Sequence, residues 1–438
     1  MATKNEFMMN IIPTQDIWAT NTVEASIHTD LEMIEDVYYG DVDEYLIKHD
    51  KETNTDKRQK LAAFNNYIKG IVDSLLTPVF SKSALRSSNS ILFEEFIVNC
   101  DNRGNDLQKF TKEVVKWTKM HGVTFVVMDN FSEVPDTIDE VIASRAFPYV
   151  YQVMADEVYG YETDDFGNLT CLLFENGEDE KGEDLYTYID SEVKCEGYIR
   201  KGGYVVMETI VHNLGFLPII SLYDSISLDI LPPAPFKDIC LMNLQIYNQQ
   251  SEQRVIERNS AFSMLTLDTG GDEHAINLNV GSSSILAYGH RDKSVNAPAW
   301  IAPDAAILTV MMECANNTIN NLLQQAGLLG VNIIVNDTST SGEHLAYKYI
   351  PTMYAIKDIA SLAEEFEVMV SELFMQFIMT EFEYICKYND SYLPTGLELT
   401  EKIATYQTIL GLQLDETFNQ KLKQNIMEDI TNIYNIGE

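Results

Sequence analysis

Few residues in this sequence have the types and spacing that catalysis requires. Ser341 and His344 stand three positions apart and could act as a nucleophile and its base, although a solvated loop histidine is the simpler interpretation. The sequence contains no GxxxxGK followed by Ser or Thr, no GxSxG and no HExxH motif. We therefore predict that the chain is not an enzyme.

Two acidic loops are candidates for metal binding, and neither has the required ligand spacing. A calcium-loop frame through 164–168, begun at Glu162, would place Phe166 at its fifth position and Leu173 at its twelfth. Neither residue offers the oxygen ligand that calcium needs there. We interpret 175–184 as a solvated hairpin tip, with adventitious divalent binding as the alternative. The sequence thus predicts no metal and no cofactor.

The composition restricts the partners further. The 438 residues include 30 Lys+Arg and 67 Asp+Glu, which gives a net charge of −37. Tight binding to phosphates depends on basic residues, so neither nucleic acid nor an acidic membrane is expected to bind to the average surface. The six cysteines lie far apart and predict free thiols in a reducing compartment. We find neither a secretory signal nor a membrane-spanning segment.

The first half of the chain combines helices with a sheet. Apolar periodicity predicts a helix over 57–80, ended by Thr77-Pro78, and two more helices over 91–120, followed by a buried strand at 123–128. Further short strands alternate with turns, so 123–222 is predicted to be a mostly antiparallel sheet. Their expected ranges are 148–151, 158–161, 169–175, 186–190, 198–200 and 204–212.

The second half is mainly helical. A proline cluster at 232–235 precedes a long predicted helix over 236–265, and a second helix is expected over 305–326. Between them lie short predicted strands at 276–280 and 284–288. The last predicted helices cover 345–388, with a break or kink at Pro351, then 398–411 and 415–436.

The two central helices have unusual polar content. The first is polar all round over 248–254, and the second has a charged and amide face opposite an apolar one. That polar face comprises Glu313, Asn316, Asn317, Asn320 and Gln324. The plainer interpretation is a solvated helix pair; the alternative is the wall of a channel along which a phosphate backbone slides. Residues 237–327 carry five basic and nine acidic side chains, so most of the net charge lies elsewhere.

Short motifs and the order of elements resemble the portal proteins of tailed bacteriophages. In that family a Ser-Gly, a Leu, a Tyr-Lys and a Pro open the long helix after a tunnel loop, and here Ser341, Gly342, Leu345, Tyr347, Lys348 and Pro351 fit this pattern. The stretch 145–151, RAFPYVY, is similar to a second portal motif before the central sheet. Glu343-His344 departs from the family, which usually has a small or apolar residue before the Leu, and the C-terminal region is short.

The resemblance implies an α+β portal fold that assembles into a ring, of twelve subunits in relatives. Its expected parts, in chain order, are a wing over 1–235, stem helix 1 over 236–267, a β clip over 268–303, stem helix 2 over 304–327, a tunnel loop and long wing helix over 328–388, and a helical crown over 389–438.

The resemblance also implies sites and partners. The tunnel loop facing DNA would contain Asn336, Asp337, Thr338, Ser339, Thr340, Ser341, Gly342, Glu343 and His344, with Lys348 beyond it. The stem lining would contain Asn316, Asn317, Asn320, Gln324, Gln249, Arg254 and Arg258. The clip contacts would be Tyr288, His290, Arg291 and Trp300.

The function so implied is the head-to-tail connector through which double-stranded DNA is packaged and ejected. Terminase, a head–tail adaptor and the major capsid protein are the expected partners, without a membrane. The expected location is the portal vertex of the virion, after assembly in the bacterial cytoplasm. Three alternatives remain open. One is another connector or collar ring of the virion, and a less favoured one is an acidic metal-dependent hydrolase, which would need clustered carboxylates at ligand spacing. The third is a cytosolic scaffold protein of the host that does not act on DNA.

Overall fold

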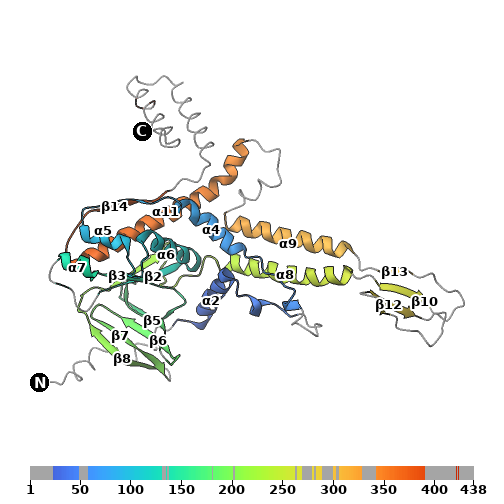
Figure 1. Ribbon diagram of the computed structural model, residues 1–438, viewed down its shortest axis with the longest axis horizontal. Helices are drawn as coiled ribbons and strands as arrows, with labels where there is room; N and C mark the ends of the chain where they lie inside the picture. Colours follow the sequence, from blue (N-terminus) through green and yellow to red (C-terminus); the bar gives the residue numbers. More distant parts are fainter. Residues whose placement is uncertain are drawn as a thin grey trace.

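The computed structural model describes most of the chain. The described residues are 23–48, 58–130, 135, 138–179, 181–200, 203–261, 264–268, 279–280, 283–288, 299–301, 305–327, 342–389, 421 and 423. They form a body of helices and sheets from which a pair of long helices extends, ending in a small sheet (Figure 1). The predicted helices at 398–411 and 415–436 lie outside the described residues, apart from 421 and 423.

The body is a mixed α/β structure, in agreement with the predicted α+β class. Its helices are α2 (Ala25–Tyr39), the 3-10 turn η1 (Asp43–Tyr45), α4 (Tyr67–Phe80), α5 (Ile91–Val98), α6 (Leu107–His121), α7 (Ile138–Ser144) and α11 (Gly342–Ile378). The extension consists of α8 (Lys237–Ala261) and α9 (Ala305–Gln325), with β10 (Met264–Asp268), β11 (Asn279–Val280), β12 (Ser283–Tyr288) and β13 (Ala299–Ile301) at its tip.

A three-stranded sheet lies at the centre of the body, in the order β3-β2-β9, with all pairs antiparallel. Its strands are β2 (Val123–Asp129), β3 (Tyr149–Val153) and β9 (Ile219–Tyr223). Residues along β2 alternate between two cores: Val126 and Met128 pack with the helices, whereas Phe125 and Val127 pack towards the second sheet. Burial on both faces explains why β2 is continuously apolar.

The second sheet of the body is a five-stranded antiparallel meander in the order β4-β5-β6-β7-β8. Its strands are β4 (Val158–Thr163), β5 (Leu169–Glu178), β6 (Asp184–Ile189), β7 (Val193–Arg200) and β8 (Gly203–Val211). Val158, Leu172, Phe174 and Ile189 pack against the central sheet. The two acidic loops considered above lie at the ends of hairpins of this sheet, and their described residues are mostly exposed.

Hydrogen bonds within the chain account for the polar residues of these hairpins. Asp164 accepts hydrogen bonds from the side-chain amide of Asn168 and from the backbone N–H groups of Asn168 and Phe166, and these bonds lower the pKa of its carboxyl group. Asp179 accepts backbone hydrogen bonds in the same way, together with the hydroxyl of Tyr198. Both acids therefore stabilise turns.

Several elements differ from the sequence prediction. α4 begins at Tyr67, where Asn66 accepts a hydrogen bond from the Lys69 N–H, and it continues through Pro78. α8 ends at Ala261, and β10 begins where the helix was expected to continue. α11 is helical through Pro351 but ends at Ile378, and the strand β14 (Tyr384–Lys387) occupies the predicted end of the helix.

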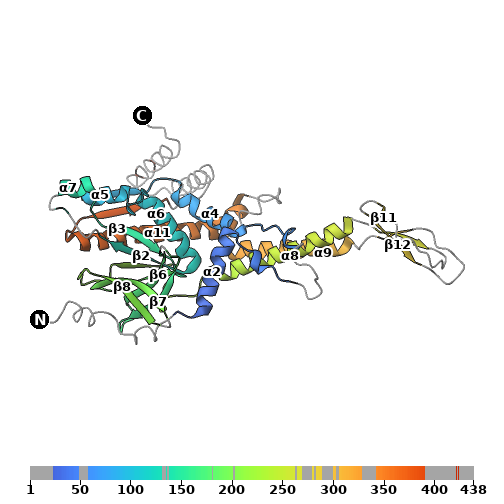
Figure 2. The ribbon, with the colours of Figure 1, turned by 60° about the horizontal axis from the view of Figure 1, so that its bottom comes forward.

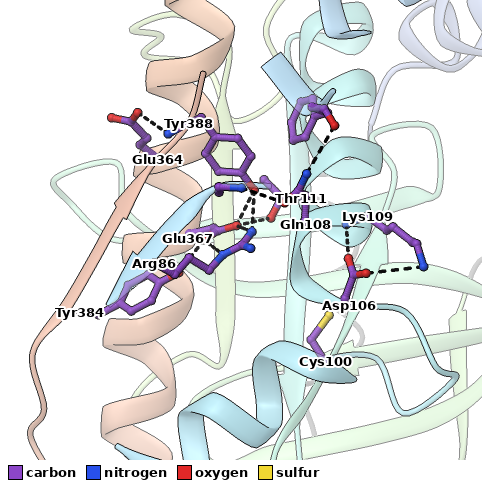
Figure 3. Close-up of polar contacts among 12 residues, drawn as sticks. Arg86, Cys100, Asp106, Gln108, Lys109, Thr111, Glu364, Glu367, Tyr384 and Tyr388 are labelled. Atoms are coloured by element: carbon purple, nitrogen blue, oxygen red, sulfur yellow. Dashed lines mark hydrogen bonds and ion pairs between the residues drawn. The ribbon is translucent and has the colours of Figure 1, made fainter. Parts of the chain in front are cut away.

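The strand β14 pairs antiparallel with β1 (Leu85–Ser88), a strand that the sequence analysis did not predict. The pairing brings Arg86 to Glu367 of α11, whose side chain is fully buried (Figure 3). Arg86 donates from Nε and Nη2 to the two carboxylate oxygens, at 2.9 and 2.5 Å. The hydroxyls of Tyr384 and Tyr388 also donate to Glu367, as does Thr111 of α6 at 3.3 Å.

This network predicts a large stability cost for removing the charge of Glu367. Glu367→Gln leaves the Arg86 guanidinium, whose side chain is only 15% exposed, without a counter-charge, and it gives the tyrosine hydroxyls an amide that accepts at only one atom. We expect a loss of about 3–5 kcal/mol in the free energy of unfolding, measured by chemical denaturation. Glu365→Gln, an exposed site on the same helix, is the matched control and should change it by less than about 0.5 kcal/mol.

The pH dependence of this difference tests its electrostatic origin. Burial opposes ionisation of Glu367, but the hydrogen bonds and charge of Arg86 outweigh it and lower the pKa of this carboxyl group. Its contribution is therefore present above the unfolded-state pKa, about 4.3, and is lost as the pH falls through the lower folded-state pKa. The gap between wild type and Glu367→Gln should shrink below about pH 4; a gap unchanged by pH would contradict the ion-pair explanation.

Candidate functional site

The helix pair α8 and α9 projects from the body and is the most distinctive part of the molecule. The helices lie side by side in both views and run antiparallel, because the small sheet connects the end of α8 to the start of α9 (Figures 1 and 2). With 25 and 21 residues, they are about 37 and 32 Å long.

The predicted polar face of α9 is exposed to solvent. Glu313, Asn316, Asn317, Asn320 and Gln324 are all exposed in the single chain. The opposite face packs towards α8 and the body, with Ala315 and Leu322 buried and Ile319 partly buried against the main core. The 3.6-residue period therefore placed both faces correctly.

A third surface of α9 is apolar and also exposed. Ile307 and Val310 lie one turn apart on the flank between the buried and the amide faces, and they are 54% and 57% exposed. The helix contains no Lys or Arg and a single acid, Glu313. A helix exposed on most of its circumference would ordinarily carry many charges, so this surface is suited to contact with another molecule.

The polar residues of α8 have a different explanation, one internal to the chain. Asn248 accepts a hydrogen bond from Ile47 N and donates to Tyr45 O, at 2.8 and 3.0 Å. Gln250 accepts from the Asn65 amide, and Arg254 donates to the Leu61 carbonyl at 3.0 Å.

Arg254, predicted to line a channel, thus binds the segment that leads into α4. Gln249 is partly buried, and Arg258 is exposed near the tip of the helix. The sequence could not distinguish these anchoring residues from the freely exposed amides of α9, because their partners lie about 200 positions away.

The strands at the tip form one small sheet in the order β11-β12-β10-β13. β10 pairs parallel with β12 and antiparallel with β13, and the Cα atoms of Asp268 and Leu265 lie opposite Tyr288 and Trp300 respectively. Two of the predicted contact residues are thereby placed in the sheet. His290 and Arg291 lie outside the described residues.

The predicted tunnel loop falls mostly outside the described residues, which exclude 336–341. Gly342 begins α11, so Glu343 and His344 belong to the first turn of that helix, and Lys348 follows in the second. The prediction that the loop extends to His344 is therefore wrong. The helix α11, which contains Pro351, is attached to the extension, because Thr352 donates a hydrogen bond to the carbonyl oxygen of Gly327, just after α9.

A cluster of ionisable residues that the sequence did not indicate lies in the body. Glu35, His121 and Asp156 come together from α2, the end of α6 and the turn after β3. Burial and the neighbouring Asp156 carboxylate raise the pKa of Glu35 to about 9, and burial lowers that of His121 to about 4. No sequence motif indicates this cluster, because the three residues are separated by 86 and 35 positions and share no local pattern.

The thiols and the helix hydropathy complete the description of the chain. All six cysteines are unpaired, and Cys314 alone is exposed. Among the helices of the described residues, none has the length and apolarity needed to cross a lipid bilayer.

Comparisons with known proteins find similarity only among solved structures. No family model and no curated protein matches the sequence. A solved structure described as the neck of an empty GTA particle, computed with C6 symmetry, is similar over 86% of this chain and 94% of its own. The sequence identity is 10% and the TM-score is 0.42.

The faces of α9 generate a prediction for the single chain. Leu322→Ala should reduce the free energy of unfolding by about 2–5 kcal/mol, because Leu322 is fully buried where α9 meets the core. Asn320→Ala, on the exposed face, should change it by less than about 0.5 kcal/mol. Denaturant titration of both variants measures the difference; equal costs would mean that α9 packs by another face.

Proposed function

We propose that this protein is a ring-forming connector between the head and tail of a virus-like particle, and more specifically a phage portal protein. The single observation that carries the proposal is α9, an exposed helix with an amide face, an apolar flank and no basic residue, in a helix pair that ends in a small sheet. This arrangement matches the stem and clip that the motif resemblance implies. In this proposal the protein is not an enzyme.

The apolar flank of α9 supports assembly from identical copies. Ile307 and Val310 are 54% and 57% exposed in one chain, so covering them gains about half of the 1.5–3 kcal/mol that full burial of such a side chain is worth. A neighbouring copy related by rotation would cover the same flank in every subunit, which closes a ring when the rotation closes. A groove of about 460 Å³ beside α8, lined by Ile47, Leu241 and Leu244 among others, is a second apolar surface that a neighbouring copy would cover.

The amide face supports a channel for DNA. Each phosphate contact by Lys or Arg adds affinity through counterion release, so a basic wall would hold the duplex in place. Asn316, Asn317 and Asn320 are polar enough to face water but carry no charge that a phosphate would bind. A wall of this chemistry lets DNA move. The small sheet would then contact terminase during packaging and an adaptor afterwards, and the wing would contact the major capsid protein.

The ring is the first part of the proposal to test. Purified protein should form rings with a central hole in negative-stain electron microscopy and have a native mass near 600 kDa if about twelve 49.7-kDa copies assemble. Val310→Asp should prevent assembly, because it places a carboxylate in the buried flank of each contact.

Thr309→Asp is the matched control, since it adds the same charge one residue away on the exposed polar side. A compact dimer or tetramer without a hole would reject the ring. Equal assembly of the two variants would reject this interface. If the protein stays monomeric alone, the same comparison is made with capsid protein and scaffold present.

A second prediction concerns the channel wall and requires the ring. Asn316→Lys with Asn320→Lys adds two cations per subunit on the amide face, so packaging should slow and its salt dependence should steepen. Asn316→Gln with Asn320→Gln is the control and should package normally. Packaged DNA length and packaging rate are the measurements; full-rate packaging by intact lysine-substituted rings would show that this face does not line the DNA path.

A further inference from the structure

The cluster of Glu35, His121 and Asp156 lies where three parts of the body meet. Glu35 belongs to α2, His121 is the last residue of α6, and Asp156 lies in the turn between β3 and β4. The helix α6 ends at Gly122 in a left-handed conformation, with φ of +91°. A Cβ at Gly122 would come within 3.1 Å of Pro232, so this junction also adjoins the root of α8.

The imidazole of His121 is fully buried and faces the two carboxylates. Its Nε2 is 3.8 Å from Glu35 Oε1, and its Nδ1 is 3.9 Å from Asp156 Oδ1. None of these four atoms has a hydrogen-bond partner. Buried polar groups are nearly always hydrogen-bonded, so four such atoms facing one another require a bridging partner.

The surroundings supply no cation for this site. Among the described residues, no Lys or Arg forms an ion pair with Glu35 or Asp156; Lys119, on the same helix turn as His121, pairs with Asp224 instead. Two carboxylates held together in a largely buried place repel each other when both are ionised, and either a proton kept on one of them or a cation between them relieves the repulsion. Both side chains keep some solvent exposure, 19% and 17%, so a small ion can enter from solvent.

We propose that Glu35, His121 and Asp156 bind one divalent transition-metal ion, with Zn²⁺ as the preferred ion. One ligand atom from each residue lies within 4.8 Å of the others, and ligand atoms around tetrahedral zinc are about 3.4 Å apart, so modest side-chain movement closes the site. Imidazole selects Zn²⁺ over Mg²⁺ and Ca²⁺, which prefer oxygen ligands alone. Water completes the coordination.

The ion has a structural role in this arrangement. It links α2 to the end of α6 and to the start of the five-stranded sheet, next to the root of the helix pair. Binding to the folded state alone stabilises that state by mass action, so the ion raises the melting temperature of the body. The inference does not depend on ring formation or DNA.

The test is metal binding by the full-length chain after chelator treatment and dialysis. Zn²⁺ titration by calorimetry should give one tight site per chain, and Co²⁺ should give the visible absorption of a nitrogen–oxygen site. Glu35→Gln and Asp156→Asn, which nearly preserve side-chain shape, should each weaken binding at least about tenfold and abolish the thermal shift with Zn²⁺. Circular dichroism establishes that each variant is folded.

The control addresses the acidity of the whole chain, because a net charge of −37 attracts divalent ions without a specific site. Glu32→Gln removes one exposed carboxylate from α2, close to Glu35, and should leave the tight site unchanged. Two results would overturn the proposal: wild-type protein with no stoichiometric site, or Zn²⁺ affinity that is the same in Glu35→Gln, Asp156→Asn and Glu32→Gln. The Co²⁺ spectrum of wild type decides the matter independently should a variant fail to fold.

Discussion

The fully buried carboxylate of Glu367 imposes the strongest constraint on the body. An ionised carboxylate is tolerated there only because Arg86, Tyr384, Tyr388 and Thr111 all donate to it. These donors come from β1, β14 and its end, and α6, so the strand pair, α6 and α11 hold their relative positions together. If one donor strand moved away, a charge would remain buried without compensation. The interaction therefore favours one arrangement of the body over slightly shifted alternatives.

The extension depends on this body through polar contacts at its root. Asn243 of α8 is fully buried, accepts a hydrogen bond from Tyr67 N and donates one to Asn65 O. Asn248 and Arg254 extend the same attachment along α8, while Thr352 attaches α9 to α11. Hydrogen bonds are directional, so they fix the angle of a long helix better than apolar contact alone does. The polar residues of α8 thus attach this helix to the body.

Sequence patterns predicted correctly those elements whose structure depends on neighbouring residues in the chain. The run at 123–128 could be predicted as a buried strand because both of its faces are apolar, and the period of α9 separated its buried and exposed faces. The predictions that failed concern residues whose partners lie far away in the sequence. Leu85–Ser88 and Tyr384–Lys387 pair across about 300 residues, and neither sequence is strongly apolar. The same limit applies to the attachments made by Asn248 and Arg254 and to the cluster of Glu35, His121 and Asp156. A short window of sequence does not contain the partners that folding brings to these residues.

The distribution of charge links the fold to the proposed assembly. Closing a ring places identical surfaces side by side, so any charge near the axis is repeated and repels itself. α8 carries three basic and three acidic residues and α9 only Glu313, so the helix pair contributes one of the 37 net negative charges. Elements with so little net charge can approach one another closely around an axis, whereas the acidic body suits a greater radius. In the proposed ring, the amides of α9 suit both requirements of such a wall, because they neither repel their own copies nor bind phosphates, and Glu313 is the one charge of this face that each copy repeats.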